Sequence, residues 1–287
     1  MDKLSIEIVS NTEINAVYFG LALSGYEYSD INKSAFVIEM ADRIKNYSGL
    51  DDVRRYFGDA RQKTCDVYPF WPRAALLEGA TFFMSSEGFS FDQYCDYIKS
   101  RPNLTAEEKN DDFFCWVKDF PRYLQKIKTD DLFIKINRQI ERIVHRLAVD
   151  MAAQKTKIAD ILVTLSTDIE TDIPSLSVVI CPIKCIYSAD YFVNGAEMSV
   201  ILGDFLPRSV VHEYMHLVVH PVISKNREMI LSQSGKKKFG ISQTYYLDND
   251  DDGFINAFEE HIVRTASNLV CDETDINIEQ LIKNELV

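Results

Sequence analysis

Residues 206–221, LPRSVVHEYMHLVVHP, constrain the fold more than any other stretch of the sequence. Pro207 and Pro221 stand where prolines begin and close a helix. His212 and His216 are four residues apart and therefore share one face of that helix. A helix that bears two such histidines has to be buried on its other sides, and the neighbouring residues are suitably uncharged: Val210, Tyr214, Met215, Leu217 and Val218.

His212, Glu213 and His216 form the pattern H-E-x-x-H, whose residue types suit a metal ion. Both imidazoles project from one helix face at a separation suited to a single tetrahedral metal. Glu213 follows the first histidine beside that face, where its carboxylate can reach a metal-bound water. The alternative is a structural helix with two hydrogen-bonded histidines, but a glutamate buried without a metal or partner costs free energy. The pattern therefore predicts a zinc site.

A catalytic zinc ion needs a third protein ligand, and several residues downstream are candidates. His220 lies too far along the predicted helix to share the ion. In a second predicted helix, 254–270, Glu259 lies near the edge of the apolar stripe and stands in a capping-box relation to Asn256. Glu260 points about 100° further round that helix. The residues alone leave both glutamates open, and the other candidates are Glu228, the aspartates of 248–252, and His261.

The combination of H-E-x-x-H with a later glutamate resembles the zincin metallopeptidases, specifically the gluzincin group. In that group the pattern supplies two zinc ligands and a general base, and a glutamate on a later helix supplies the third ligand. The resemblance implies that His212, His216 and Glu260 hold zinc and that Glu213 is the base. It also implies a zincin-like fold.

This resemblance covers residues 195–270 and has limits. Arg264, one turn after Glu260, occupies a place that is often acidic in the family. The segment HEYMHLVVHP also resembles uncharacterised zincin-like families, in which aliphatic residues follow the pattern as far as a proline. No H-x-x-G-x-x-H continuation follows His216, so the metzincin pattern is absent.

Residues 248–259 fit a different metal-binding template, the calcium loop D-x-D-x-D-G-x5-E. An EF-hand needs an entering helix, and the preceding segment SGKKKFGISQTYYL has two glycines and no helical stripe. An acidic run before a helix also complements the helix dipole without any calcium. We therefore expect these acids to form the first turn of the following helix, and calcium binding is kept as the alternative.

Helical patterns dominate the chain from an opening strand at 4–9 to about residue 153, where 130–153 is one long amphipathic helix. Short β-branched runs then predict strands at 159–166, 176–183 and 197–205. Helices are also predicted at 29–47, 105–120, 206–221, 254–270 and 275–286.

This order of elements predicts an α+β fold. Residues 1–155 are expected to form a mainly helical region. Residues 156–287 are expected to form a zincin-like metal-binding region, with a small mixed sheet and the H-E-x-x-H helix. The two regions can also form one continuous domain.

The charge of the chain bears on its partners. Net charge is −13, and the largest basic cluster is GKKKFG at 235–240, which argues against nucleic acid and anionic membrane surfaces as partners. The first residues are too acidic for a signal peptide, and no apolar run reaches the length of a bilayer span. We expect a cytoplasmic protein with reduced cysteines.

The leading hypothesis is a zinc-dependent hydrolase, specifically a peptidase, that acts on a peptide or protein substrate. Glu213 would accept a proton from the attacking water and pass it to the leaving amine. The strand at 197–205 is where related folds place an edge that pairs with an extended peptide. The alternatives are a calcium-dependent binding protein and a zincin-shaped scaffold without turnover. Four residues are candidate oxyanion donors: Tyr245, Tyr246, His261 and Arg264.

Overall fold

The computed structural model describes residues 4–25, 34–59, 74–84, 90–100, 111–166, 175–184, 189–233, 251–272 and 277–286. Its elements are β1 (Ser5–Val9), α1 (Thr12–Leu23), α2 (Ala35–Lys45), α3 (Asp51–Gly58), α5 (Ala74–Met84), α6 (Phe91–Ser100), α7 (Asp111–Lys128), α8 (Asp131–Asp150), α9 (Ala152–Ser166), β2 (Ser175–Ile180), β3 (Asp190–Asn194), β4 (Glu197–Leu202), α10 (Pro207–Lys225), α11 (Arg227–Gln233), α12 (Asp251–Cys271) and α13 (Ile278–Leu286). The chain is mostly helical with one small mixed sheet, which confirms the predicted α+β class.

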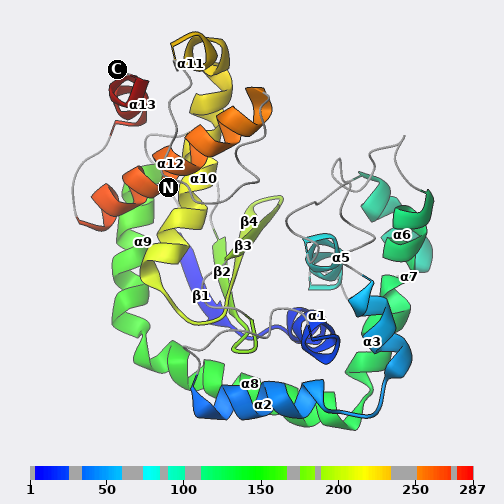
Figure 1. Cartoon of the computed structure of the whole chain (residues 1–287). Coiled ribbons are helices and arrows are strands. Elements are labelled where there is room, and N and C mark those ends of the chain that lie inside the picture. The colour runs from blue at the N-terminus through cyan, green and yellow to red at the C-terminus, as the bar shows by residue number, and fades with distance from the viewer. Residues whose placement is uncertain are drawn as a thin grey trace.

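The four strands form one sheet in the order β1-β2-β4-β3. Strands β1, β2 and β4 run parallel, and β3 runs antiparallel to β4. In Figure 1 the sheet lies between α9, α10 and α12 on one side and α1 and α5 on the other. The central strands β2 and β4 are largely buried, as parallel strands covered by helices have to be.

The two predicted regions share this sheet. Strand β1 comes from the first region and pairs with β2 from the second, from Ser5–Ser175 to Val9–Val179. The predicted boundary at residues 155 and 156 falls inside α9. The sheet that carries the H-E-x-x-H helix therefore depends on a strand from the start of the chain.

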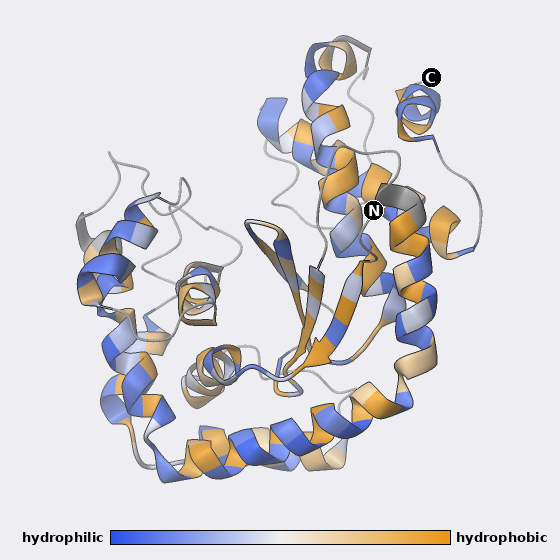
Figure 2. Ribbon diagram, turned by 180° about the vertical axis from the view of Figure 1, so that it is seen from behind, coloured by the Kyte–Doolittle hydropathy of each residue, from blue (hydrophilic) through white to orange (hydrophobic). Residues whose placement is uncertain are grey.

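The prediction of a strand at 159–166 is wrong, because these residues belong to α9. Ile158 and Leu162 are buried and stand one helical turn apart, so burial at helical spacing outweighs the local β-branched composition. The long helix predicted at 130–153 is confirmed in the main as α8, whose buried residues include Phe133, Ile136 and Ile140. In Figure 2 hydrophobic and hydrophilic residues alternate along α8, as expected of a helix with one buried face.

The expectation that 197–205 forms an edge of the sheet is also wrong. Strand β4 lies between β2 and β3, and β3 is the edge on that side. No strand is predicted at 190–194, yet β3 and β4 are joined by a two-residue hairpin whose Gly195 has φ of 60°. The dipeptide Asn194-Gly195 before an apolar run is a recognised hairpin signal, and it would have revealed β3.

Helix α10 begins at Pro207, as predicted, but it does not end at Pro221. It continues to Lys225, with Pro221 inside it. A proline inside a helix removes one hydrogen bond to the carbonyl four residues earlier, here that of Leu217. Pro221 is exposed and Leu217 is partly exposed, so water can replace the missing donor. Among the described residues, no helix is both long and apolar enough to cross a membrane.

The packing of α1 on α3 generates a prediction about stability. A Cβ atom added at Gly20 would lie 2.6 Å from three atoms of the buried Phe57 ring. Gly20→Ala should therefore lower the free energy of unfolding by roughly 1–3 kcal/mol, measured by urea denaturation, because the ring cannot move away in a packed core. The control is Gly58→Ala, since a Cβ there meets only the Ser24 Cβ at 3.9 Å. Equal stability of the two variants would contradict this account of the α1–α3 contact.

Candidate metal centre

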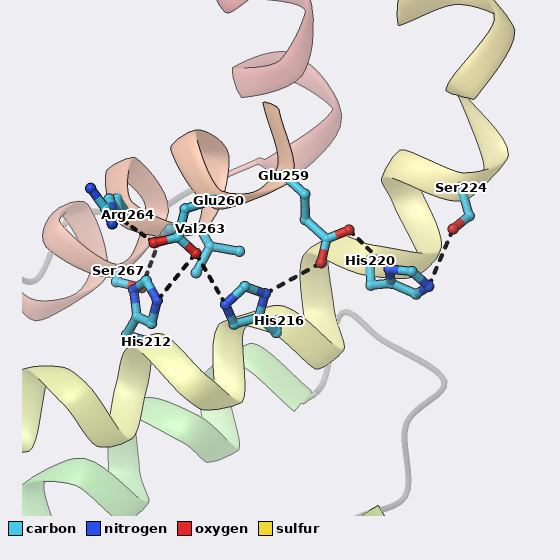
Figure 3. Close-up of polar contacts among 9 residues, drawn as sticks. All are labelled: His212, His216, His220, Ser224, Glu259, Glu260, Val263, Arg264 and Ser267. Atoms are coloured by element: carbon cyan, nitrogen blue, oxygen red, sulfur yellow. Dashed lines mark hydrogen bonds and ion pairs between the residues drawn. The ribbon is translucent and has the colours of Figure 1, made fainter. Parts of the chain in front are cut away.

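Helices α10 and α12 pack against each other and bring three predicted ligands together. His212 and His216 project from α10, and Glu260 projects toward them from α12 (Figure 3). Their side chains are partly or fully buried. Among the described residues, these three are the group of histidine, cysteine and carboxylate side chains that could hold a metal ion.

The spacing of the three side chains fits a zinc ion. Glu260 Oε2 lies 3.7 Å from His212 Nε2 and 3.5 Å from His216 Nε2, and all three ligand atoms lie within 4.8 Å of one another. Ligand atoms about 2.0–2.1 Å from a tetrahedral zinc are roughly 3.4 Å apart. The two distances from Glu260 are close to that value, so only a small inward movement is needed for all three atoms to bind one ion.

The second oxygen of Glu260 is held by Arg264, which donates from Nε to Oε1 over 2.6 Å. This is the arginine that stands where the resembling family often has an acid. Burial alone would raise the pKa of Glu260, but the contacts with His212 and His216 outweigh burial and hold the pKa well below its usual range. Glu260 is therefore an anion with one oxygen fixed by Arg264 and the other directed at the two histidines.

Glu259 has a different role from the one predicted. The capping box with Asn256 is wrong, because α12 begins at Asp251 and Asn256 lies inside it. Instead Glu259 Oε1 lies 3.3 Å from His216 Nδ1, and Oε2 lies 2.9 Å from His220 Nδ1. A proton on His216 Nδ1 would be donated to Glu259, which leaves Nε2 to face Glu260.

The carboxylates around His216 also change its pKa. Burial lowers it, but the hydrogen bonds to Glu259 and Glu260 outweigh burial and raise the pKa of His216 to about 9. The pKa of Glu259 is lowered, because its contacts with His216 and His220 outweigh its burial. Glu259 and Glu260 therefore favour the protonated form of His216, and a metal ion would have to displace the proton on Nε2.

Glu213 lies on the buried side of α10, and only 9% of its surface is exposed. Burial raises its pKa, although the neighbouring His212 and His216 oppose this. No hydrogen bond to its carboxylate is formed by any residue that the structure describes. A desolvated carboxylate of this kind next to a metal site is suited to accept a proton.

Tyr191 also belongs to the site, and the sequence analysis did not identify it. It lies on β3, and its ring is stacked on the His216 imidazole with centroids 5.6 Å apart and planes at 16°. Burial, Glu213 and Glu259 together raise the pKa of Tyr191 to about 12. The sequence predicts no strand at 190–194, and without that strand there is no reason to expect Tyr191 near the histidines.

The remaining candidate residues lie elsewhere or have other partners. The side chain of His220 is 66% exposed and contacts Glu259. His261 Nε2 lies 2.8 Å from Glu285 Oε2 on α13, and Glu228 is exposed on α11. Tyr245 and Tyr246 lie outside the described residues.

The described part of the calcium template is helical. Asp252 and Gly253, at positions 5 and 6 of the template, lie in the first turn of α12, whereas a calcium loop makes a sharp turn at this glycine before its exiting helix. Asp252 is paired with Arg227 at 2.6 Å, and Glu259 faces the histidines of α10. Asp251 and Asp252 form the acidic first turn expected of this helix, and Asp248 and Asp250 lie outside the described residues.

This geometry predicts which variants lose metal. Changing His212, His216 or Glu260 to alanine should abolish stoichiometric zinc, because two remaining protein ligands do not hold zinc against water. The measurement is the metal content of dialysed protein. The control is His145→Ala, which removes an exposed histidine of α8 and should leave one zinc per chain. Full zinc content in any of the first three variants would refute the assigned site.

Comparisons of this chain with models of protein families, with curated proteins and with solved structures found no match.

Proposed function

We propose that this chain is a zinc-dependent hydrolase that cleaves peptide bonds. The single observation that carries the proposal is the convergence of His212, His216 and Glu260 at zinc-ligand spacing. Glu213 is close enough to all three to interact with them electrostatically. Two histidines and one carboxylate form a ligand set typical of catalytic zinc, which keeps one position open for water or substrate. A zinc ion bound there would act as a Lewis acid that lowers the pKa of water and polarises a carbonyl group.

The residues of this chain supply the proton transfers. Glu213 is the general base, which takes a proton from the attacking water and later delivers it to the leaving amine. Two features of the surroundings of Glu213 favour this role. A raised pKa brings the carboxylate nearer to the pH at which it has to exchange protons. No side chain among the described residues forms a hydrogen bond to it, which leaves it available.

The Glu259 carboxylate lies within hydrogen-bonding distance of His216 Nδ1, the ring nitrogen that does not face Glu260. Histidines that bind metals usually direct their other ring nitrogen at a carboxylate, which fixes the ring and its tautomer. Glu259 stands in that position, and its second oxygen is braced by His220. In this proposal Glu259, the acid adjacent to the third ligand, orients His216, and Arg264 holds the third ligand itself.

The sheet favours a peptide as substrate. Strand β3 is an antiparallel edge beside the histidine helix, and β4 is its one neighbour among the described strands. An edge strand can pair through its backbone with an extended chain. This arrangement supports the zincin-like assignment, with β3 in the role that the sequence analysis gave to β4.

Glu213→Gln tests the general base. The amide keeps the size of the side chain but cannot accept the proton of water, so hydrolysis should fall by at least about 10²–10⁴-fold while zinc content is unchanged. A fluorogenic peptide library in the presence of zinc would first identify a cleaved sequence. Unchanged turnover in Glu213→Gln would exclude the role, and a wild-type protein that binds zinc but cleaves no peptide would count against the proposed function.

Glu259→Ala tests the supporting carboxylate. We expect the dissociation constant for zinc to rise by about 10–100-fold, as is typical when a residue that orients a ligand is lost, while saturating zinc still gives one ion per chain. Competition with a chromophoric chelator measures this constant. Glu285→Ala is the matched control, because it breaks a glutamate–histidine contact of α12 that does not involve a ligand. Equal zinc affinity in the two variants would show that Glu259 does not orient His216.

A further inference from the structure

One exposed face of α8 carries a row of positive charges, in a chain whose net charge is −13. Residues three and four apart share a face of a helix, and four exposed basic residues of α8 follow that spacing. We call these four residues the basic stripe: Lys135, Arg138, Arg142 and Arg146. From the first residue to the last, the basic stripe extends roughly 17 Å along the helix axis.

The charges of the basic stripe have no counter-charge within the part of the chain that the structure describes. None of the four side chains forms an ion pair there, and Arg146 Nε donates one hydrogen bond, at 3.4 Å, to the backbone carbonyl of Arg142. Arg138 and Arg142 are four residues apart, as are Arg142 and Arg146. Like charges at this spacing destabilise a helix, so an anionic partner bound along the stripe would relieve a repulsion that the free protein carries.

Glu141 is the one acidic residue between the ends of the basic stripe, and its carboxylate is bound elsewhere. Asn137 Nδ2 donates a hydrogen bond to Glu141 Oε1 at 2.8 Å. The Asn137 side chain is buried, and its Oδ1 accepts a second hydrogen bond, at 2.8 Å, from Asn15 of α1. Glu141 is therefore held by a buried amide network, and it does not neutralise the neighbouring Arg138 and Arg142.

The surface is hollowed at the C-terminal half of the basic stripe. An open hollow of about 530 Å³ is lined there by Glu141, Arg142, His145 and Arg146. Val149, which is 66% exposed, continues the same face of the helix beyond the hollow. A partner that lies in the hollow would meet two arginines, whose planar guanidinium groups suit carboxylates, and then an exposed apolar side chain.

The length of the basic stripe favours an acidic polypeptide over other polyanions. Asp131 and Asp150 are exposed one turn before its first residue and one turn after its last. A nucleic acid or an anionic membrane surface carries charge far beyond these ends, so it would meet both aspartates and the field of an acidic chain. A short acidic segment of a protein fits between the aspartates, and Val149 offers it an apolar contact that a phosphate backbone lacks the groups to use.

We propose that the basic stripe of α8 is a docking site for an acidic segment of a partner protein. Glutamate or aspartate side chains of that segment pair with the arginines of the stripe, and an apolar residue of the segment packs on Val149. Helix α8 lies apart from α10 and α12 (Figure 1). The docking site is therefore separate from the metal centre, and this inference does not rest on the proposed function.

An oligoglutamate peptide tests the docking site. The probe is fluorescently labelled, is long enough to span the basic stripe and ends in leucine, and its binding to the full chain is measured by fluorescence anisotropy. The wild-type protein should bind the peptide with an affinity that falls as salt is added, because the contacts join exposed charges. The double variant Arg142→Glu, Arg146→Glu should bind it at least about tenfold more weakly, because two attractive contacts become repulsive.

The matched control is the double variant Lys99→Glu, Lys283→Glu. It changes the net charge by the same amount at exposed positions of α6 and α13, away from α8 (Figure 1), and should bind the peptide as the wild type does. An equal loss of affinity in both double variants would overturn the proposal, because the net charge and not the stripe would then govern binding. Zinc content of the dialysed protein should be the same in the wild type and in both double variants, so failure of the docking site and failure of the metal centre are distinguishable.

Two further results would overturn the proposal. One is a wild-type protein that does not bind the peptide at low salt. The other is tighter binding of a single-stranded oligonucleotide with the same number of charges, or of vesicles that contain phosphatidylserine, since the stripe would then recognise phosphates and not an acidic polypeptide.

Discussion

The contact between α10 and α12 brings three carboxylates, those of Glu213, Glu259 and Glu260, into a small and largely water-free space. Charges that are removed from water have to be compensated nearby. Arg264 and the histidines of α10 provide part of this compensation. Three carboxylic acids share this space with one arginine, and Glu213 has no hydrogen-bonding partner among the described residues, so acidic groups are in excess over the fixed charge of Arg264. A divalent cation between the two helices would balance that excess, which is why the packing of α10 on α12 and the proposed metal are best understood together.

The sheet fixes the position of α10 and therefore its contact with α12. Parallel pairing joins β1, β2 and β4, and the chain passes from β4 directly into α10. The buried pair of Lys184 and Asp190 fixes the start of β3, so that Tyr191 stands against His216. A buried ion pair does not need to add stability, because desolvation offsets much of its attraction. Its value in this protein is that it fixes one position of the edge strand relative to the histidine helix.

The sequence predicts the parts of this structure that depend on local periodicity. The four-residue spacing of His212 and His216 defines the face of α10, and the helical stripe of 254–270 directs Glu260 toward that face. The contacts of Glu259 were not predictable in this way, because its partners His216 and His220 are 43 and 39 residues away. Strand β3 was missed for a related reason. It is a five-residue edge strand with no fully buried position, so it lacks the apolar alternation that reveals longer strands.

The surroundings of the two histidines in α10 are unequal, and this has a consequence for how an ion would enter. His216 is restrained on three sides, by Glu259 at Nδ1, by Glu260 at Nε2 and by Tyr191 on its ring face. His212 contacts Glu260 and lies edge-on to His216. In the proposed site, His216 and Glu260 would be held in place before an ion arrived, so less side-chain entropy would be lost on binding than if both side chains were free to rotate. His212, which has fewer restraints among the described residues, would then be the last ligand to bind the ion and the first to release it, and its release would set the lifetime of the bound ion.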